Sequence, residues 1–345
     1  MAVYTEIDKR ELGVIADDYS LVKIGTVSGI PYGSVNTNYL LDTPRGKHLL
    51  RIDEVKGELD VKRELELLLF LRKHSFPCPH PLADRKGRYY REVDGKCLSV
   101  YRYIDGHVVR PERMTAAQLE SVGHALAELH SIGKNYKKGI ENRFSYERIA
   151  DLYGEVRTRL PSYFRRTIRT LDDEVDYLQY YLENKLPKGI IHGDLFNDNL
   201  IFKGDKVVVM LDFEAACRGK FIFDLATAVN ALCFDGTKYQ LKRFEAMLTG
   251  YEALRPLSLA EWDAFPNELR FSALRFTVTR LRDFFLNPVD RRARVHKDFR
   301  EFYERLRILR REREGGMEGL LMAMATGYDY RKYQKVKALE KKSSK

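Results

Sequence analysis

The sequence predicts an α+β chain in two lobes: a small N-terminal lobe with an antiparallel sheet and one helix, and a larger, mainly helical C-terminal lobe. Residues 21–28, 38–42, 48–52 and 98–104 have the composition and alternation of strands. From residue 118 onward, apolar residues recur at helical spacing instead. We expect an N-lobe over residues 1–104, a C-lobe over 105–310 and a basic tail over 311–345.

The helices are predicted from apolar periodicity. In the N-lobe, the apolar residues 65–71 predict one helix that begins at Glu64. In the C-lobe, residues 118–130 predict a core helix, residues 145–183 two charged helices, and residues 257–286 another helical region. Ser258 and Glu261 form a capping-box pattern at the start of the last region. Residues 200–202 and 207–211 flank a turn and predict a β-hairpin.

Composition limits the class of protein. The length suits one large or two modest lobes, and 44% hydrophobic residues suffice for a core. The four cysteines, at 78, 97, 217 and 233, lack the paired short spacing of a metal or redox motif, so we expect reduced, buried thiols. No apolar stretch approaches the length of a membrane span. We therefore expect a cytoplasmic protein with no membrane partner.

The formal net charge is +10, which raises the question of a nucleic-acid partner. Residues 326–345 hold seven Lys or Arg against two acids, and so contribute half of this excess. We favour a solvated, partly disordered tail over a phosphate-rich partner. A positive cleft would also suit an enzyme with anionic ligands.

Residues 192–199 are the most informative segment, with the sequence His-Gly-Asp-Leu-Phe-Asn-Asp-Asn. Asp194 and Asn199 have the spacing of the base and the metal-binding Asn in a kinase catalytic loop. Asp212 ends the apolar strand of the predicted hairpin, which would fold it back beside Asn199. The pattern predicts phosphoryl transfer from ATP, with Asp194 as base and with Asn199 and Asp212 holding Mg²⁺.

Two further residues of this region have predicted structural roles. His192 is expected to be a packing and hydrogen-bonding anchor, and Asp224, just ahead of an apolar helix, an orienter of the loop. The plain alternative is that Asp and Asn are ordinary turn residues. Asp212 after a buried strand and Asp224 before an apolar helix favour kinase-like chemistry instead.

Together these motifs resemble the aminoglycoside phosphotransferase and choline kinase group, and within it the bacterial homoserine kinases of that type. The likeness extends over residues 1–5, 33–40, 76–81, 192–199, 212–217, 224–226, 250–257, 274–276 and 279–281, and continues to about residue 310. It implies a protein-kinase-like fold and ATP-dependent phosphorylation of the homoserine hydroxyl, on the route to threonine. The partner would be a small molecule; the oligomeric state does not follow from the sequence.

The resemblance implies that the turn over residues 29–34 covers the nucleotide phosphates. Gly29 and Gly33 would permit close backbone approach, and Asn36 and Asn38 would steady the loop. An ordinary hairpin would have a similar sequence.

Arg51 stands on the third strand, where many kinases carry a phosphate-binding Lys. Arginine can also bind phosphate oxygens, and Glu64 is its natural ion-pair partner. The alternative is an ordinary charged strand edge. Tyr103 and Ile104 end the strand that leads into the expected hinge, whose backbone would contact adenine.

Two positions depart from the family pattern: Gly193 where Ala is usual, and Glu214 where an aromatic residue is common. Glu214 could receive an ammonium group of a different amino alcohol. Homoserine itself needs a cation for its carboxylate and an anion or carbonyl for its ammonium group. Arg275, Arg280 and Asp283 are the candidates, although Arg280 and Asp283 could simply pair with each other on a helix.

Three other functions stay open. A kinase of another small amino or sugar alcohol, such as choline, methylthioribose or an aminoglycoside, would share every motif. A protein kinase is disfavoured because no Asp-Phe-Gly to Ala-Pro-Glu activation segment follows Asp212. A non-catalytic module that binds nucleotide or nucleic acid is suggested by Arg51 in place of Lys and by the basic tail.

Overall fold

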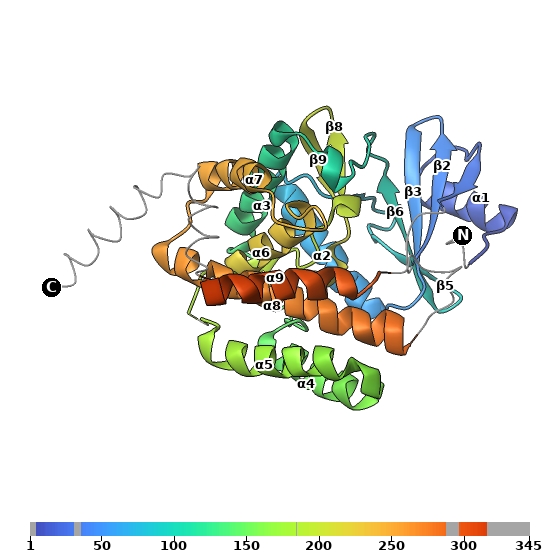
Figure 1. The fold of residues 1–345 in the computed structure, drawn as a ribbon. Helices are drawn as coiled ribbons and strands as arrows, with labels where there is room; N and C mark the ends of the chain where they lie inside the picture. The colour runs from blue at the N-terminus through green and yellow to red at the C-terminus, as the bar shows by residue number, and fades with distance from the viewer. Residues whose placement is uncertain (1–4, 31–35, 184, 288–296, 316–345) are drawn as a thin grey trace. The chain divides into compact units, whose positions relative to one another are not determined.

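The computed structural model describes residues 5–30, 36–183, 185–287 and 297–315 (Figure 1). The chain divides into two compact units. The first combines Met1–Gly106, Val208–Glu214 and Pro288–Lys297, and the second combines His107–Val207, Ala215–Asn287 and Asp298–Lys345. No helix within the described ranges is long and apolar enough to span a bilayer. Most of the expected tail, 311–345, lies outside the described residues.

An antiparallel sheet forms the core of the first unit. The strand order is β1-β2-β3-β6-β4, and β5 also pairs with β6. Leu50 lies opposite both Tyr39 and Val100, and all three side chains are buried against Ile15 of helix α1. The elements are α1 (Lys9–Asp18), β1 (Val27–Gly29), β2 (Thr37–Thr43), β3 (Gly46–Asp53), β4 (His80–Pro81), β5 (Arg91–Val93) and β6 (Lys96–Arg102).

Helix α2 (Glu58–Lys73) contacts β3 through polar side chains. Because side chains alternate along a strand, Arg51 projects from the face of β3 opposite Leu50, and there it meets Glu64 of α2. The expected start of this helix at Glu64 was wrong, since α2 begins at Glu58. Acidic residues in the first turn favour this earlier start, because they interact with the positive end of the helix dipole.

The predicted strands 38–42 and 48–52 are confirmed, and 98–104 is confirmed up to Arg102. Residues 21–28 were wrong as one strand, because only the short β1 forms there. Ser20 and Val22 have φ values of 55° and 69°, which no extended strand allows. Helix α1 was not predicted, although Asp8 caps it by accepting a hydrogen bond from the amide of Glu11 at 2.7 Å.

The second unit is mainly helical, as predicted. Its helices are α3 (Ala116–Gly133), α4 (Tyr146–Arg159), α5 (Arg165–Tyr181), α6 (Phe221–Leu232), α7 (Leu241–Leu254), α8 (Leu259–Arg280), the π-helical turn η5 (Leu281–Leu286) and α9 (Arg300–Gly315). Every residue of α6 is buried, so this helix forms the centre of the unit. The capping box of Ser258 and Glu261 is present at the start of α8. Strand β7 (Lys188–Ile191) pairs with β10 (Cys217–Lys220), and β8 (Leu200–Lys203) pairs with β9 (Lys206–Met210) as the predicted hairpin.

Helices α3 and α7 cross at unusually short distance. A Cβ atom on Gly123 would lie 1.8 Å from the carbonyl oxygen of Met247, and a Cβ on Gly250 would lie 1.8 Å from that of Glu120. Any side chain larger than hydrogen would therefore force the two backbones apart. This contact brings the C-terminal ends of α3 and α7 close enough for their side chains to bond.

The expectation of buried cysteines is confirmed. Cys78, Cys97, Cys217 and Cys233 are all buried and none is in a disulfide. Burial raises the pKa of the Cys78, Cys217 and Cys233 thiols to about 12.

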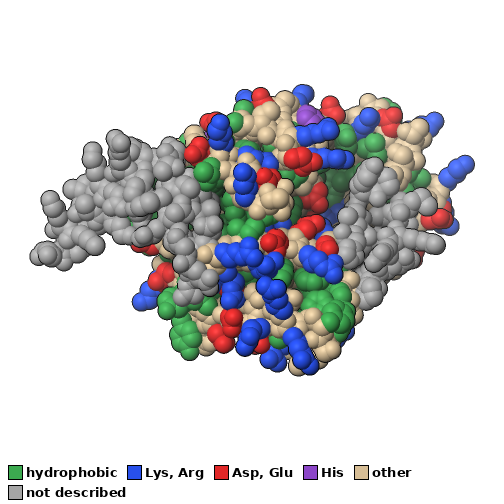
Figure 2. Space-filling model, in the orientation of Figure 1, with side chains coloured by type: hydrophobic (Ala, Val, Ile, Leu, Met, Phe, Trp, Pro, Cys, Tyr) green, Lys and Arg blue, Asp and Glu red, His purple; other side chains and the backbone are tan. Residues whose placement is uncertain are grey.

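Basic side chains are prominent on the face of the second unit that carries α8 and α9, with acidic side chains beside them (Figure 2). Several arginines of α9 are paired within the unit. Arg307 contacts Glu304 at 2.7 Å, and Arg310 contacts Asp173 at 3.1 Å. Part of the positive charge is therefore neutralised locally.

Candidate active site

The predicted catalytic loop follows β7 in the second unit and is anchored by Asp224 of α6. One carboxylate oxygen of Asp224 accepts a hydrogen bond from the amide of His192 at 2.7 Å, and the other accepts from the amide of Gly193 at 2.8 Å. Gly193 has φ = 76°, a conformation that favours glycine. Burial raises the pKa of Asp224, but the hydrogen bonds from His130 and from the Gly193 amide and the electrostatic influence of the two neighbouring histidines outweigh it, and the pKa lies below the usual value.

Side chains within the loop fix its shape. His192 is fully buried, and its Nδ1 accepts from the amide of Asp194 at 3.2 Å. Asn199 donates from Nδ2 to the carbonyl oxygen of Asp194 at 2.9 Å, which leaves its Oδ1 as the atom able to coordinate a cation. Asp194 itself is half-buried. The loop backbone is thus held while the side chain of Asp194 keeps access to solvent.

Arg275 of α8 reaches the same loop. Its guanidinium donates to the carbonyl oxygen of Gly193 and lies 3.8 Å from the ring centre of Phe144 and 4.1 Å from that of Phe276. Burial lowers its pKa to about 10, and the charge of Asp194 opposes this shift. Arg275 is only 3% exposed, so its observed contacts support the loop; its contact with substrate stays a prediction.

Arg280 and Asp283 do not pair with each other. Arg280 contacts Glu301 at 2.8 Å and lies over the ring of Phe302, whereas Asp283 accepts two hydrogen bonds from Arg282. The helix spacing that suggested a mutual pair was overridden by packing of α9 against α8. Their roles in substrate binding stay predictions.

In the first unit, Arg51 belongs to a dense cluster of charges. Its guanidinium contacts Glu64 at 3.1 Å, as expected, and also Asp53 at 3.1 Å. Lys56 contacts Asp53 at 3.7 Å and also pairs with Glu64. Burial raises the pKa of Glu64, but Arg51 and Lys56 outweigh it and lower the net value; in Asp53 burial prevails and the pKa is raised.

Lys56 was missed by sequence reasoning. It lies just after β3, in a segment without a recognisable motif. The available signal was its spacing, three residues after Asp53. In the structure Asp53 contacts both Arg51 and Lys56. Lys56 therefore shares the carboxylates of Asp53 and Glu64 with Arg51.

Glu214 joins this cluster. Its Oε1 is bound by Arg51, by Lys56 at 2.9 Å and by the side-chain Nδ2 of Asn36 at 2.7 Å. The carboxylate was expected to receive the ammonium group of an acceptor, and that role stays a prediction. In the structure, two protein cations already contact it.

Asp212 lies in the first unit, whereas Asp194 and Asn199 lie in the second. Its backbone has φ = 59°, a conformation that is costly for a residue with a side chain and is concentrated at functional sites. Its side chain is exposed, and Oδ1 accepts from the amide of Glu214 at 3.4 Å. Within the described residues, no three His, Cys, Asp or Glu gather as a metal site. The binding of Mg²⁺ by Asp212 and Asn199 stays a prediction.

Among the described residues, the other predicted nucleotide contacts lie on strands of the first sheet or directly beside them. Gly29 ends β1, and Asn38 donates to the carbonyl oxygen of Asn36 at 3.2 Å. Gly33 lies outside the described residues. Tyr103 donates its amide to the carbonyl oxygen of Lys47 at 3.2 Å, and Ile104 is half-buried.

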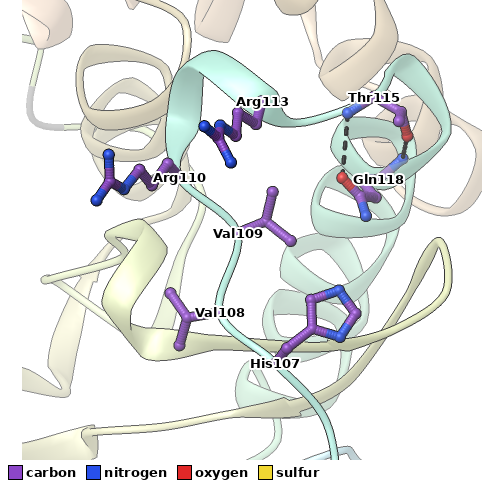
Figure 3. Close-up of a pocket in the computed structure, with 7 residues that line it drawn as sticks. All are labelled: His107, Val108, Val109, Arg110, Arg113, Thr115 and Gln118. Atoms are coloured by element: carbon purple, nitrogen blue, oxygen red, sulfur yellow. Dashed lines mark hydrogen bonds between the residues drawn. The ribbon is translucent and has the colours of Figure 1, made fainter.

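Directly after the expected hinge, a pocket of about 470 Å³ lies in the second unit (Figure 3). It is lined by His107, Val108, Val109, Arg110, Arg113, Thr115 and Gln118. His107 pairs with Phe202 of β8 through backbone hydrogen bonds of 3.0 and 2.9 Å. In Figure 3, Arg110 and Arg113 lie on one side, while Thr115 and Gln118 bond to each other in the capping box of α3. No sequence motif indicated this pocket.

The sequence matches a known protein family and several curated relatives. Residues 26–257 match the model of the phosphotransferase enzyme family. Homoserine kinase of Rhodospirillum rubrum is 34% identical over 93% of this chain and 99% of its own length. Homoserine kinase of Brucella anthropi is 33% identical over 93% of this chain and 98% of its own.

Solved structures agree with the predicted fold class. An amicoumacin kinase in complex with AMP-PNP, Ca²⁺ and Ami has a TM-score of 0.66 at 16% identity, covering 90% of this chain and 94% of its own. A microcompartment-associated aminopropanol kinase has a TM-score of 0.65 at 18% identity, covering 84% and 93%. These likenesses confirm the two-part arrangement of an antiparallel sheet and a helical region that the sequence predicted.

Proposed function

This chain belongs to the phosphotransferase enzyme family and phosphorylates an alcohol, and we propose that this alcohol is L-homoserine. The reaction would be the ATP-dependent phosphorylation of L-homoserine to O-phospho-L-homoserine. The observation that carries the proposal is the identity to homoserine kinases along nearly the whole of both chains. A shared fold alone would leave the acceptor undetermined.

The proposed mechanism is in-line transfer of the γ-phosphoryl group. Asp194 orients the acceptor hydroxyl and takes its proton, while the bonds from Asn199, His192 and Asp224 keep the loop backbone in place. Asn199 and Asp212 would hold Mg²⁺. When bound, the cation neutralises charge on the ATP phosphates.

On the nucleotide side, Arg51 and Lys56 are proposed to bind phosphate oxygens. Glu64 contacts both cations and so fixes their position, which is the role of the helix glutamate in kinases. The turn with Gly29 and Gly33 would cover the phosphates, steadied by Asn36 and Asn38. The backbone of Tyr103 and Ile104 would contact adenine.

On the acceptor side, homoserine presents a carboxylate and an ammonium group. Arg275 or Arg280 is proposed to bind the carboxylate, and Asp283 or Glu214 the ammonium group. Glu214 also motivates a second candidate, a kinase of another small amino alcohol, because a carboxylate at this position departs from the family pattern. In that case the chemistry would be the same and the acceptor pocket different.

The test is a coupled assay of ADP release with Mg-ATP and separate acceptors: homoserine, choline, serine, an aminoglycoside and a methylthio-sugar. We expect a homoserine-dependent rate far above the others. Asp194→Ala should lose about 10²-fold or more of that rate, because a positioned base contributes this much. Asp198→Ala, an exposed residue of the same loop, is the matched control and should keep the rate.

Each result has a definite meaning. Activity with a different acceptor would replace homoserine and keep the reaction class. No ADP release with any acceptor would contradict the proposal. If Asp194→Ala kept near-normal turnover, the assignment of the base would be wrong.

A further inference from the structure

A chain of buried polar side chains extends from the catalytic loop into the helical core. Besides the two loop amides, Asp224 contacts Nε2 of His130 at 3.0 Å. Nδ1 of His130 lies 2.7 Å from the hydroxyl of Tyr251, and that hydroxyl lies 2.9 Å from a guanidinium nitrogen of Arg255. Arg255 contacts Glu261 at 2.6 Å. Asp224, His130 and Tyr251 are each 0% exposed.

The donor and acceptor roles along this chain determine where the protons lie. A guanidinium can only donate, so the Tyr251 oxygen accepts from Arg255. On the other side of the ring, the carboxylate of Asp224 can only accept, so the ring proton of neutral His130 lies on Nε2. Nδ1 is then an acceptor, and it receives the hydroxyl proton of Tyr251. Asp224 and Tyr251 therefore favour the same tautomer of His130, and Tyr251 holds the ring from a second helix.

The tautomer matters because one oxygen of Asp224 has two contacts. The oxygen that accepts from His130 also accepts from the amide of His192. In the other tautomer, a lone pair of the imidazole would face this oxygen, and the two groups would repel each other. The carboxylate would then move, and with it the loop amides that it holds.

We propose that His130 and Tyr251 are positioning residues for phosphoryl transfer: Tyr251 holds the ring of His130 through Nδ1, His130 fixes the carboxylate of Asp224 through Nε2, and Asp224 fixes the backbone that carries Asp194. The inference rests on the proposed phosphoryl transfer, and not on which alcohol is the acceptor. Arg255 anchors the outer end, since it also lies 4.7 Å from the ring centre of Phe221.

The first test removes the Tyr251 hydroxyl. Tyr251→Phe should lower kcat by about ten- to a hundredfold, because a small displacement of a catalytic group has an effect of this order, while the KM values for ATP and acceptor change little. The matched control is Tyr153→Phe. Tyr153 is also buried, and its hydroxyl also has two partners, Asp172 and the carbonyl oxygen of Ile168, but these lie away from the loop. Tyr153→Phe should lose similar stability and keep kcat.

The second test uses the wild-type protein and needs no turnover. In ¹⁵N-histidine-labelled protein, the ring nitrogens of His130 should give the Nε2–H pattern at neutral pH, with assignment by His130→Gln. A Nδ1–H or imidazolium pattern would overturn the proposal. So would equal kcat values for Tyr251→Phe and Tyr153→Phe. If the wild type were inactive with homoserine, the proposed function would fail, but the tautomer would still be measured.

Discussion

Arg51 and Lys56 contact the same three carboxylates, those of Asp53, Glu64 and Glu214. Neither cation is therefore committed to a single partner. With all groups ionised, the acids exceed the bases by one, and burial already raises the pKa of Asp53. A phosphate group of ATP would have to compete with these carboxylates for contact with Arg51 and Lys56. We expect it to need both cations.

This arrangement predicts the effect of removing Lys56. Lys56→Met should raise the KM for ATP by about tenfold or more, since a charge-assisted hydrogen bond is worth about 1.5–3 kcal/mol. The KM for the acceptor should stay within about twofold, as steady-state kinetics can measure. Lys62→Met, an exposed lysine of α2, is the control and should leave both values unchanged. An unchanged KM for ATP in Lys56→Met would exclude Lys56 from phosphate binding.

His130 predicts how stability depends on pH. Burial lowers its pKa below the ordinary 6.5, and Asp224, Arg255 and Glu261 act on the same ring. Below pH 6.5 the unfolded chain gains a proton that the folded protein does not bind. Stability from this residue is therefore fully present above pH 6.5 and falls as the pH drops, by at most about 1.4 kcal/mol per pH unit.

The measurement is urea unfolding of wild type and His130→Gln between pH 5 and 7.5. The wild type should lose more unfolding free energy on acidification than the variant. Other histidines, such as His48 and His80, are present in both proteins and cancel in the comparison. Equal slopes would show that His130 titrates normally in the folded protein.

At the scale of elements, the packing of α3 against α7 also sets the positions of His130 and Tyr251, which we propose hold the catalytic loop. Gly123 and Gly250 allow backbone contact, and the same crossing brings His130 within hydrogen-bonding distance of Tyr251. The helices therefore have little freedom to slide without breaking the buried polar chain. Stability and the position of the catalytic loop should change together here.

Gly250→Ala tests this coupling. The new Cβ would overlap a backbone oxygen of α3, which no rotamer can relieve, so the variant should lose about 1–3 kcal/mol or more of stability. Gly154→Ala, on exposed α4 with nothing within 4 Å of the added atom, should instead gain up to about 1 kcal/mol. Thermal unfolding of both variants measures the difference. A Gly250→Ala protein as stable as wild type would show that the helices can separate freely.

At the scale of the whole molecule, local patterns predicted what local interactions determine. The hairpin of β8 and β9, the capping box of Ser258 and Glu261, and most core helices each depend on residues close in sequence. The prediction of a strand at 21–28 was wrong. Ser20 and Val22 have a left-handed backbone conformation, which the alternation of apolar residues does not reveal. Helix α1 was missed although its cap, Asp8, was visible.

The candidate site shows the same division. Asp194, Asn199 and Asp212 could be proposed from the sequence because their spacing is a motif, and their roles stay predictions. His130 belongs to no sequence motif, because its partners Asp224 and Tyr251 are about a hundred positions away and only the fold brings them to it. Lys56 escaped notice for a similar reason, because Glu214 reaches it from a distant segment.

The burial of all four cysteines has a practical consequence for experiments on this enzyme. A thiol reacts as the thiolate, and burial that raises the pKa of Cys78, Cys217 and Cys233 to about 12 leaves almost no thiolate at neutral pH. The native cysteines should therefore react only slowly with maleimide reagents. One cysteine introduced on each unit would carry a fluorophore pair without removal of any native residue, and energy transfer between the fluorophores would test whether nucleotide changes the distance between the units.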